Sequence, residues 1–281
     1  MPAASAKSPH VPLHAPTLFE APLHHRFLIV QMTRSQVVGR YRGSYLGIFW
    51  SFINPLLLLC VYTLVFRYIF KAKFIKHAPE GPADFALMLF AALIVFNLFA
   101  ECLTRAPGLI LQNSNYVTKV VFPLEILPLT VVLGSLIHLA IGAAPLYLAT
   151  FLTRHGHLHS SAFLWPLLLV PITLWGLAVA WMVSALGAFL RDLSEIVLAL
   201  TQVLMYASAV FYSIDQVPLE LQPIVRLNPL SFLCEQSRNL IVWGDPMDWT
   251  AYGWVTLLGL VAAALSYKVF MSVKPAFADV I

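Results

Sequence analysis

One stretch of the chain decides its fold: residues 40–66, which read RYRGSYLGIFWSFINPLLLLCVYTLVF. Arginines stand at positions 40 and 42, and no further charge follows until Arg67, which leaves the 24 residues 43–66 uncharged. A helix rises about 1.5 Å per residue, so about 20 apolar residues cross the roughly 30 Å hydrocarbon core of a bilayer. The stretch therefore predicts a first membrane-spanning helix at about residues 44–66.

The composition predicts that most of the chain has lipid as its solvent. Hydrophobic residues make up 60% of the 281 residues and charged residues only 11%, whereas soluble domains have about 25% charged residues. The net charge of +4 fits loops that face anionic headgroups and does not call for a nucleic-acid partner. The three cysteines, Cys60, Cys102 and Cys234, lack CxxC spacing and imply no disulfide framework.

The apolar runs predict an all-α integral membrane protein with six transmembrane helices. Beyond the first span, the others are expected at about residues 85–103, 126–153, 164–190, 196–214 and 249–267. Residues 1–17 contain several prolines and no apolar periodicity, which predicts a disordered tail. Residues 18–281 are then expected to form a single transmembrane domain.

Three segments outside the spans have patterns of their own. Residues 18–38 mix apolar and basic side chains, which predicts an amphipathic helix on the membrane surface or, alternatively, a short soluble helix beneath it. Residues 105–123 predict a short helix parallel to the membrane and then a turn. Residues 215–248 contain four prolines and predict short re-entrant helices before the last span, which are tolerated where protein surrounds them.

Six spans would place both ends of the chain on one side of the membrane. Lysine and arginine concentrate on the cytoplasmic side, and ten of them would lie on the side of the chain ends against seven on the other. The pair of arginines just before the first span adds weight to this orientation. Both termini are therefore predicted to be cytoplasmic.

Motifs for ATP binding or catalysis are absent, since GxxxxGK[ST], GxGxxG, HExxH and GxSxG do not occur. The apolar runs also lack the series of acidic, basic and histidine residues that relays protons in secondary transporters. The chain is therefore expected to be no enzyme, but a conduit or scaffold whose energy comes from elsewhere.

Isolated titratable residues in and between the apolar runs leave alternatives open. Glu101 is either a headgroup-level residue paired with Arg105 one turn later or a partner for a neighbouring subunit. His138 favours a hydrogen-bonded place inside the bundle over a role as a ligand. An HxHxH group has metal-ligand spacing, but the lack of nearby carboxylates and cysteines favours a solvated loop. This group consists of His155, His157 and His159.

Two spans carry polar and aromatic faces that suit a sugar pathway, because aromatic rings stack on sugar CH groups and hydroxyls hydrogen-bond to them. The same side chains also anchor helices at membrane interfaces and pack bundles, so both interpretations stay open. The face of the fifth span consists of Thr201, Met205, Ser208 and Tyr212, and that of the first span of Trp50, Asn54 and Tyr62.

Five stretches occur in the order and at the spacing of a known family. The chain resembles the membrane subunit of second-type ATP-binding-cassette (ABC) exporters that move lipid-linked polysaccharides, such as O-antigen, capsule and teichoic-acid exporters. The resemblance covers about residues 25–281. The stretches are residues 40–66, NSNYVTKVVFPLEILPL (113–129), FLRDLSEI (189–196), VFYSIDQVP (210–218) and RLNPLSFLCEQSRNLIVWGDP (226–246).

The resemblance implies a homodimeric permease in the inner (cytoplasmic) membrane of a bacterium. Each copy would bind a separate nucleotide-binding ATPase subunit that holds ATP and magnesium, so this chain would need no cofactor or metal of its own. The cargo would be a polyprenyl-pyrophosphate-linked polysaccharide, either O-antigen-like or capsular. Export of small molecules or drugs, and a membrane enzyme acting on polyprenyl lipids, remain as alternatives.

The resemblance also implies roles for particular residues. Arg40 and Arg42 match the basic residues that family members place for the substrate pyrophosphate, although they also fit a positive-inside anchor. The two faces described above would line the channel, and residues 105–123 would form the coupling helix. The ATPase-coupling residues would be Asn113, Asn115, Tyr116 and Lys119. Residues 215–248 would form the outer gate, with Asn228, Pro229 and Arg238.

Overall fold

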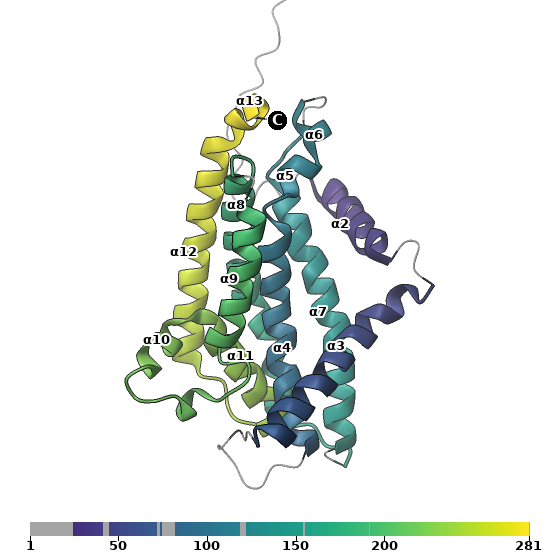
Figure 1. Cartoon of the computed structure of the whole chain (residues 1–281), viewed down its shortest axis with the longest axis vertical. Coiled ribbons are helices and arrows are strands. Elements are labelled where there is room, and N and C mark those ends of the chain that lie inside the picture. Colours follow the sequence, from purple (N-terminus) through teal and green to yellow (C-terminus); the bar gives the residue numbers. More distant parts are fainter. Residues whose placement is uncertain are drawn as a thin grey trace, which may run out of the picture.

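The computed structural model describes residues 25–41, 45–71, 74, 82–118, 122–153, 155–190 and 192–280, and the regular elements within these ranges are all helices (Figure 1). The predicted tail at 1–17 and the first residues of the predicted surface helix at 18–38 lie outside the described residues. For the described part of the chain, the prediction of an all-α protein is confirmed.

Among the described residues, five helical segments are long and apolar enough to cross a membrane, and they correspond to five of the six predicted spans. The first, Phe52–Ile69, joins α3 (Trp50–Tyr62) to the π-helix η2 (Thr63–Ile69), after the short 3-10 helix η1 (Gly47–Phe49). The others are α4 (Pro82–Arg105), α7 (Ile126–Thr153), the pair η3 (Ser160–Leu168) and α8 (Leu169–Gly187), and α12 (Trp249–Val273) with η6 (Lys274–Ala276).

At the fifth predicted span, residues 196–214, the structure differs from the prediction. The helix here is α9 (Leu193–Ala207), and its 15 residues rise about 22 Å, less than the roughly 30 Å hydrocarbon core. The helix ends because Ala209 has a φ of +51°, a left-handed conformation that an α-helix does not tolerate. Ser208 and Tyr212 therefore lie beyond the helix, and helical spacing does not place them on one face with Thr201 and Met205.

Helix α4 forms the centre of the bundle, and the segment that begins with α3 stands at its edge. Helix α4 packs against α7, α8, α9 and α11. Most of its residues are buried, whereas no described residue of Phe52–Ile69 is buried. In the described part of this single chain, α3 presents Leu56, Leu57 and Leu58 outward.

Helix α2 (Arg26–Tyr41) lies against α7 and overlaps the predicted surface helix. Ile29 and Thr33 are buried on one side of α2, while Phe27 and Val30 are exposed on the other. Gln36 Nε2 donates to Thr130 Oγ1 of α7 at 2.9 Å. This contact fixes α2 along the bundle, so that its last turn reaches the flank of α4 and α7.

Short helices close the two ends of the bundle (Figure 1). At the end that we call the α13 end lie α5 (Leu109–Gln112), α6 (Ser114–Thr118) and α13 (Phe277–Val280). At the opposite end, the α10 end, lie η4 (Ile214–Gln216), α10 (Gln222–Leu227), α11 (Pro229–Arg238) and the π-helix η5 (Asn239–Trp243). The expectation of short helices within residues 215–248 agrees with the structure.

Hydrogen bonds tie α11 to the middle of the bundle. Ser237 Oγ donates to the carbonyl of Ala91 in α4 at 2.7 Å and accepts from Trp165 Nε1 of η3 at 2.8 Å. All three residues are buried. A buried polar group that lacks a partner costs about 1–3 kcal/mol, so this chain of bonds fixes the place of α11 against two membrane helices.

Candidate functional site

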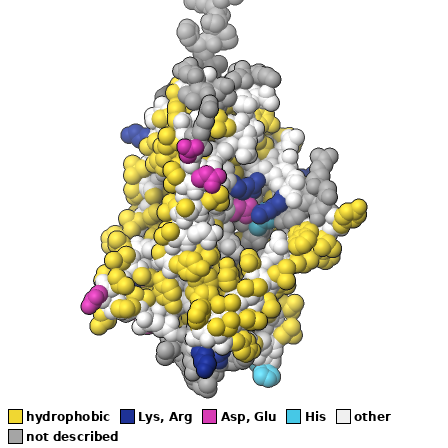
Figure 2. All heavy atoms as spheres, viewed as in Figure 1, with side chains coloured by type: hydrophobic (Ala, Val, Ile, Leu, Met, Phe, Trp, Pro, Cys, Tyr) yellow, Lys and Arg dark blue, Asp and Glu magenta, His cyan; other side chains and the backbone are white. Residues whose placement is uncertain are grey.

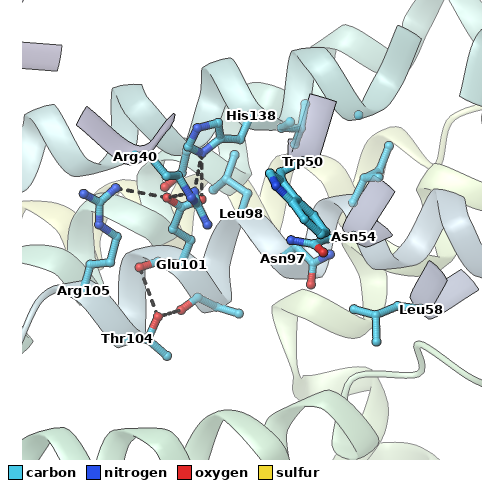
Figure 3. A pocket seen from close by; sticks show the side chains of 15 residues that line it. Arg40, Trp50, Asn54, Leu58, Asn97, Leu98, Glu101, Thr104, Arg105 and His138 are labelled. Atoms are coloured by element: carbon cyan, nitrogen blue, oxygen red, sulfur yellow. Dashed lines mark hydrogen bonds and ion pairs between the residues drawn. The ribbon is translucent and has the colours of Figure 1, made fainter. Parts of the chain in front are cut away.

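A pocket of about 610 Å³ lies between the end of α2 and helices α3, α4 and α7. It combines charged, amide and apolar side chains, and Figure 3 shows the principal ones converging on it. Figure 2 shows basic, acidic and histidine side chains gathered in one hollow of a largely hydrophobic face. The lining consists of Arg40, Trp50, Asn54, Leu58, Ile94, Asn97, Leu98, Ala100, Glu101, Thr104, Arg105, Ser135, His138, Leu139 and Gly142.

Glu101 is the centre of a charged cluster in this pocket. Its Oε1 accepts from Nη1 of Arg40 at 2.7 Å and from Nη1 of Arg105 at 3.1 Å. Its Oε2 lies 3.1 Å from Nδ1 of His138, and the same Nδ1 lies 2.8 Å from Nη1 of Arg40. With a neutral imidazole, the cluster holds two positive charges and one negative charge, and its net charge is +1.

The four side chains of this cluster differ in their access to water. Arg40 and Arg105 are 49% and 36% exposed, whereas Glu101 and His138 are each 13% exposed. Ionisable groups within membrane helices are rare and are almost always paired with one another. The cluster therefore hides its carboxylate and imidazole in the helix bundle and offers its two guanidinium groups to the pocket.

Local structure explains how these residues meet. Arg40 stands in the last turn of α2, where a positive charge is favoured by the helix dipole. Glu101 and Arg105 are one turn apart on α4, and their contact confirms the predicted pair. His138 comes from α7, the helix on which α2 rests. Arg40 and His138 are 98 residues apart, so spacing in the sequence could not predict their contact.

The predicted channel residues of the first span fall in two places. Trp50 and Asn54 line the pocket, and in Figure 3 Asn54 lies beside Asn97 of α4. Tyr62 instead belongs to an aromatic group toward the α10 end. It meets Phe211 edge-on with ring centroids 5.2 Å apart, and Phe66 stacks on Phe211 at 4.6 Å.

The predicted channel residues of the fifth span lie outside the pocket lining. Thr201 Oγ1 donates to the carbonyl of Val197 at 2.7 Å within α9, and Met205 packs partly against the core. Ser208 is buried and accepts from Asn228 Nδ2 at 3.0 Å. The hydroxyl of Tyr212 donates to the carbonyl of Tyr206 at 2.9 Å. The aromatic group around Phe211 thus joins the end of α9 to the end of the first span.

The predicted coupling residues lie at the α13 end. Asn113 and Tyr116 line a second pocket of about 730 Å³ that also touches α2. Asn113 Nδ2 donates to the carbonyl of Leu109 at 2.8 Å, and the ring of Tyr116 stacks on Phe122 at 4.6 Å. Asn115 lies in α6, while Lys119 and the predicted headgroup residue Arg42 lie outside the described residues.

The predicted gate residues are structural anchors of the α10 end. Asn228 caps α11 by accepting from the backbone N–H of Leu230 at 3.0 Å, and Pro229 begins that helix. Arg238 is fully buried, and its Nη1 and Nη2 donate to the carbonyls of Val210 at 3.3 Å and Ala209 at 2.6 Å. Burial lowers the pKa of Arg238 from its ordinary value, but an arginine stays charged at neutral pH.

The cluster's importance is what the sequence did not reveal. Glu101, Arg105 and His138 each had a structural explanation when taken alone. One sequence signal could have predicted that they meet. Few titratable side chains occur within the apolar runs, and such residues need one another as partners inside the membrane. In the described part of the chain, no group of three or more His, Cys, Asp or Glu residues is placed to hold a metal.

Comparison with known proteins adds the family to this geometry. Residues 28–242 match the ABC-2 type transporter family. An O-antigen export system permease protein RfbA of Klebsiella pneumoniae is 25% identical over 90% of this chain and 95% of its own length. A protein of the same name from Myxococcus xanthus is 26% identical over 79% of this chain and 76% of its own length. The family match covers most of a chain rich in membrane-length apolar helices, and the chain is accordingly a multi-pass membrane protein of the ABC-2 type transporter family.

Proposed function

We propose that this chain is the channel-forming subunit of an ABC transporter that exports a polyprenyl-pyrophosphate-linked polysaccharide across a bacterial inner membrane. A separate ATPase subunit that binds ATP and Mg²⁺ supplies the energy. The observation that carries the proposal is the likeness to an O-antigen export permease over 90% of the chain. The guanidinium groups that face the pocket support it, because arginine pairs with phosphate through two parallel hydrogen bonds.

The proposed topology has six crossings and both termini in the cytoplasm. Helix α2 lies toward the same end of the bundle as α13 in Figure 1. A chain that returns to its starting side must cross the membrane an even number of times, and the five long segments leave the count odd. Helix α9, together with the turn that follows it at 208–212, supplies the sixth crossing, with α2 lying along the inner membrane surface.

A second copy of the chain completes the proposed channel. The exposed apolar residues of the first span include Leu56, Leu57 and Val61, and those of α9 include Ile196 and Val203. Closed two-fold dimers are the commonest arrangement of soluble homo-oligomers, and pairing these two helices around an axis would enclose the pocket wall with Trp50 and Asn54. In this arrangement the outer half of the conduit contains the remaining predicted channel residues, which are Tyr62, Thr201, Met205, Ser208 and Tyr212.

The proposed ATPase contact lies at the α13 end, and the proposed outer gate at the α10 end. The pocket of about 730 Å³ between α2 and the α5–α6 segment offers a surface that the ATPase subunit can push against. The proposed coupling residues are Asn113, Asn115, Tyr116 and Lys119. At the other end the segment 215–248, anchored by Asn228, Pro229 and Arg238, closes the conduit toward the outside.

The test is a reconstituted complex. The chain is co-purified with a candidate nucleotide-binding ATPase subunit from the same organism and placed in proteoliposomes that contain a polyprenyl-diphosphate-linked glycan. We expect ATP hydrolysis only with both subunits present, and ATP-dependent movement of the glycan to the leaflet where a glycosidase can reach it. Equal ATP hydrolysis by the chain alone contradicts the proposal, as does a complex that moves a small hydrophobic dye but no glycan.

A further inference from the structure

We infer that Glu101 is a built-in counter-anion, which holds the place of a ligand phosphate between Arg40 and Arg105 and must be displaced before a diphosphate group binds. The inference rests on the proposed function, because it concerns how the headgroup site of that function selects its anion. It assigns to Glu101 the role of a specificity-determining residue, and to Arg105 the role of a second phosphate-binding arginine.

The geometry around Glu101 Oε1 is that of an anion site whose occupant comes from the protein. Guanidinium groups from two different helices, α2 and α4, donate to this one oxygen at 2.7 and 3.1 Å (Figure 3). Charge-assisted N–H···O bonds of this kind are what arginines form with phosphate oxygens. A phosphate oxygen in the same position would meet the same two donors.

The pocket allows this exchange without opening the helix bundle. The two arginines are the exposed members of the cluster, and the carboxylate is the covered one. The pocket of about 610 Å³ borders all of them, so an incoming anion reaches the guanidinium groups first. The displaced carboxylate keeps a neighbour, because its Oε2 already lies 3.1 Å from His138 Nδ1, which can donate to it in the Nδ1–H tautomer once Arg40 has turned to the ligand. A buried charge that retains a hydrogen-bonding partner avoids most of the penalty of an isolated one.

Charge explains why Glu101 makes the site selective. A carboxylate ligand brings the same single charge as Glu101, which competes from within the chain at a high effective concentration. A diphosphate brings at least two negative charges and enough oxygens to engage each guanidinium fork. The pocket therefore favours a diphosphate over singly charged anions. The diphosphate can belong to a lipid headgroup or to a soluble molecule.

The test compares the affinity of wild type and Glu101→Gln for inorganic pyrophosphate, with the full-length chain in phosphatidylcholine nanodiscs. Removing the competing charge should tighten binding by about tenfold, which corresponds to about 1.4 kcal/mol. The matched control is Glu195→Gln, which removes an exposed carboxylate at the start of α9, and its affinity should equal that of wild type. Equal affinities for wild type and Glu101→Gln overturn the inference.

A second variant keeps the inference testable if Glu101→Gln does not fold. Arg105→Gln removes a partly exposed guanidinium group and should weaken pyrophosphate binding by about tenfold, with an unchanged size-exclusion profile. Arg105→Lys keeps the positive charge but loses the guanidinium fork, so it should also weaken binding if Arg105 contacts the ligand and should bind as wild type does if Arg105 only neutralises Glu101. Wild-type affinity in both Arg105 variants, or in Arg105→Lys alone, overturns the inference.

Two further measurements show whether the diphosphate comes from a lipid, and whether a failed test contradicts the proposed headgroup site or only the role of Glu101. Polyprenyl diphosphate in the nanodiscs should compete with soluble pyrophosphate, and a lack of competition overturns a lipid source. Arg40→Ala should abolish binding. If Arg40→Ala binds as wild type does, the headgroup site of the proposed function is wrong. If Arg40→Ala loses binding while Glu101→Gln gains none, only the role of Glu101 is wrong.

Discussion

At the scale of single residues, two arginines of this chain show opposite uses of one side chain. Arg40 is half exposed and shares its partner with Arg105, so its charge remains available to a ligand. Arg238 is fully buried, donates to two backbone carbonyls and lies 4.7 Å from the ring centroid of Phe74. The arrangement of Arg40 suits the binding of an anion, and that of Arg238 stabilises the turn at residues 209–210.

Replacement of Arg40 and Arg42 by alanine should lower export by at least tenfold while the proposed dimer still assembles. Hydrogen bonds to charged groups contribute about 1.5–3 kcal/mol each. We expect the variant to fold, because Glu101 keeps Arg105 and His138 as neighbours when Arg40 is removed. Surface glycan, measured relative to the amount of permease in the membrane, checks this expectation. Wild-type levels of surface glycan in the double variant would exclude a role of these arginines in substrate recognition.

Replacement of Arg238 by leucine should destabilise the protein by about 2–4 kcal/mol, because the carbonyls of Ala209 and Val210 would lose their donors inside the protein. The matched control is Arg226→Leu on the same segment. The Arg226 side chain is 61% exposed, and its Nη2 lies 3.7 Å from Oδ1 of Asp215, which is 58% exposed. The loss of Arg226 should therefore cost less than about 1 kcal/mol. Thermal unfolding in detergent compares the two, and equal losses in Tm would contradict the assigned anchor.

At the scale of helices, the first span joins the two candidate regions of the molecule. Its beginning lines the charged pocket with Trp50 and Asn54, and its far end contacts the aromatic group around Phe211. Helix α9 reaches the same aromatic group from the other side through Tyr206. A movement of the first span relative to α4 would therefore change the pocket and the end of α9 together.

Trp50→Ala and Tyr212→Ala should each reduce export more than Phe163→Ala. Trp50 borders the pocket and Tyr212 bonds to the end of α9, whereas Phe163 is 76% exposed on η3 and lies outside the proposed conduit. The rate of glycan export in cells with matched permease levels is the measurement. Equal reduction by all three variants would contradict an aromatic pathway along these helices.

The helices also show what the sequence could and could not predict. Uninterrupted apolar runs marked five long segments, since burial in lipid requires little more than length and composition. The same rule extended the fifth run to residue 214, because residues 209–212 are as apolar as the helix before them. What ends α9 is the turn at Ala209 and the bonds from Arg238, 29 residues away. A hydropathy pattern cannot predict a hydrogen-bonding partner that lies so far away in the sequence.

The charged pocket illustrates the same limit for the site. The sequence placed Arg40 at the start of the first span and paired Glu101 with Arg105, both from local spacing. The meeting of Arg40, Glu101 and His138 depends on how α2 lies across α7, over separations of 61 and 98 residues. Only the packing of the whole bundle brings them together.

At the scale of the whole molecule, the two ends of the bundle differ in character. The α13 end carries short helices beside α2 and the predicted coupling residues, and the α10 end carries the segment with the buried Arg238 (Figure 1). An exporter needs this polarity, because its energy source and its exit lie on opposite sides of the membrane.

Thiol labelling should reveal this polarity directly. In intact cells with a permeable outer envelope, a membrane-impermeant maleimide should label Leu219→Cys near α10 and leave Ser272→Cys near the end of α12 unlabelled until the inner membrane is opened. Leu219 is 82% exposed, and Ser272 is exposed as well. Both variants are made in a Cys60→Ser background, which provides the baseline, because Cys60 is exposed whereas Cys102 and Cys234 are buried. Labelling of Ser272→Cys in sealed cells would reverse the proposed orientation.

The attachment of α13 has a mechanical consequence. Phe277 is buried against Phe270 and Phe189, α13 touches α6, and Lys274 Nζ reaches Glu125 Oε2 at 2.6 Å. A displacement of α6 would therefore be passed to α13 and, through the packing of Phe277 on Phe270, to the end of α12, while the Lys274–Glu125 ion pair holds that end of α12 beside the start of α7. We expect a bulky fusion after residue 281 to restrict any movement of α6 against α12.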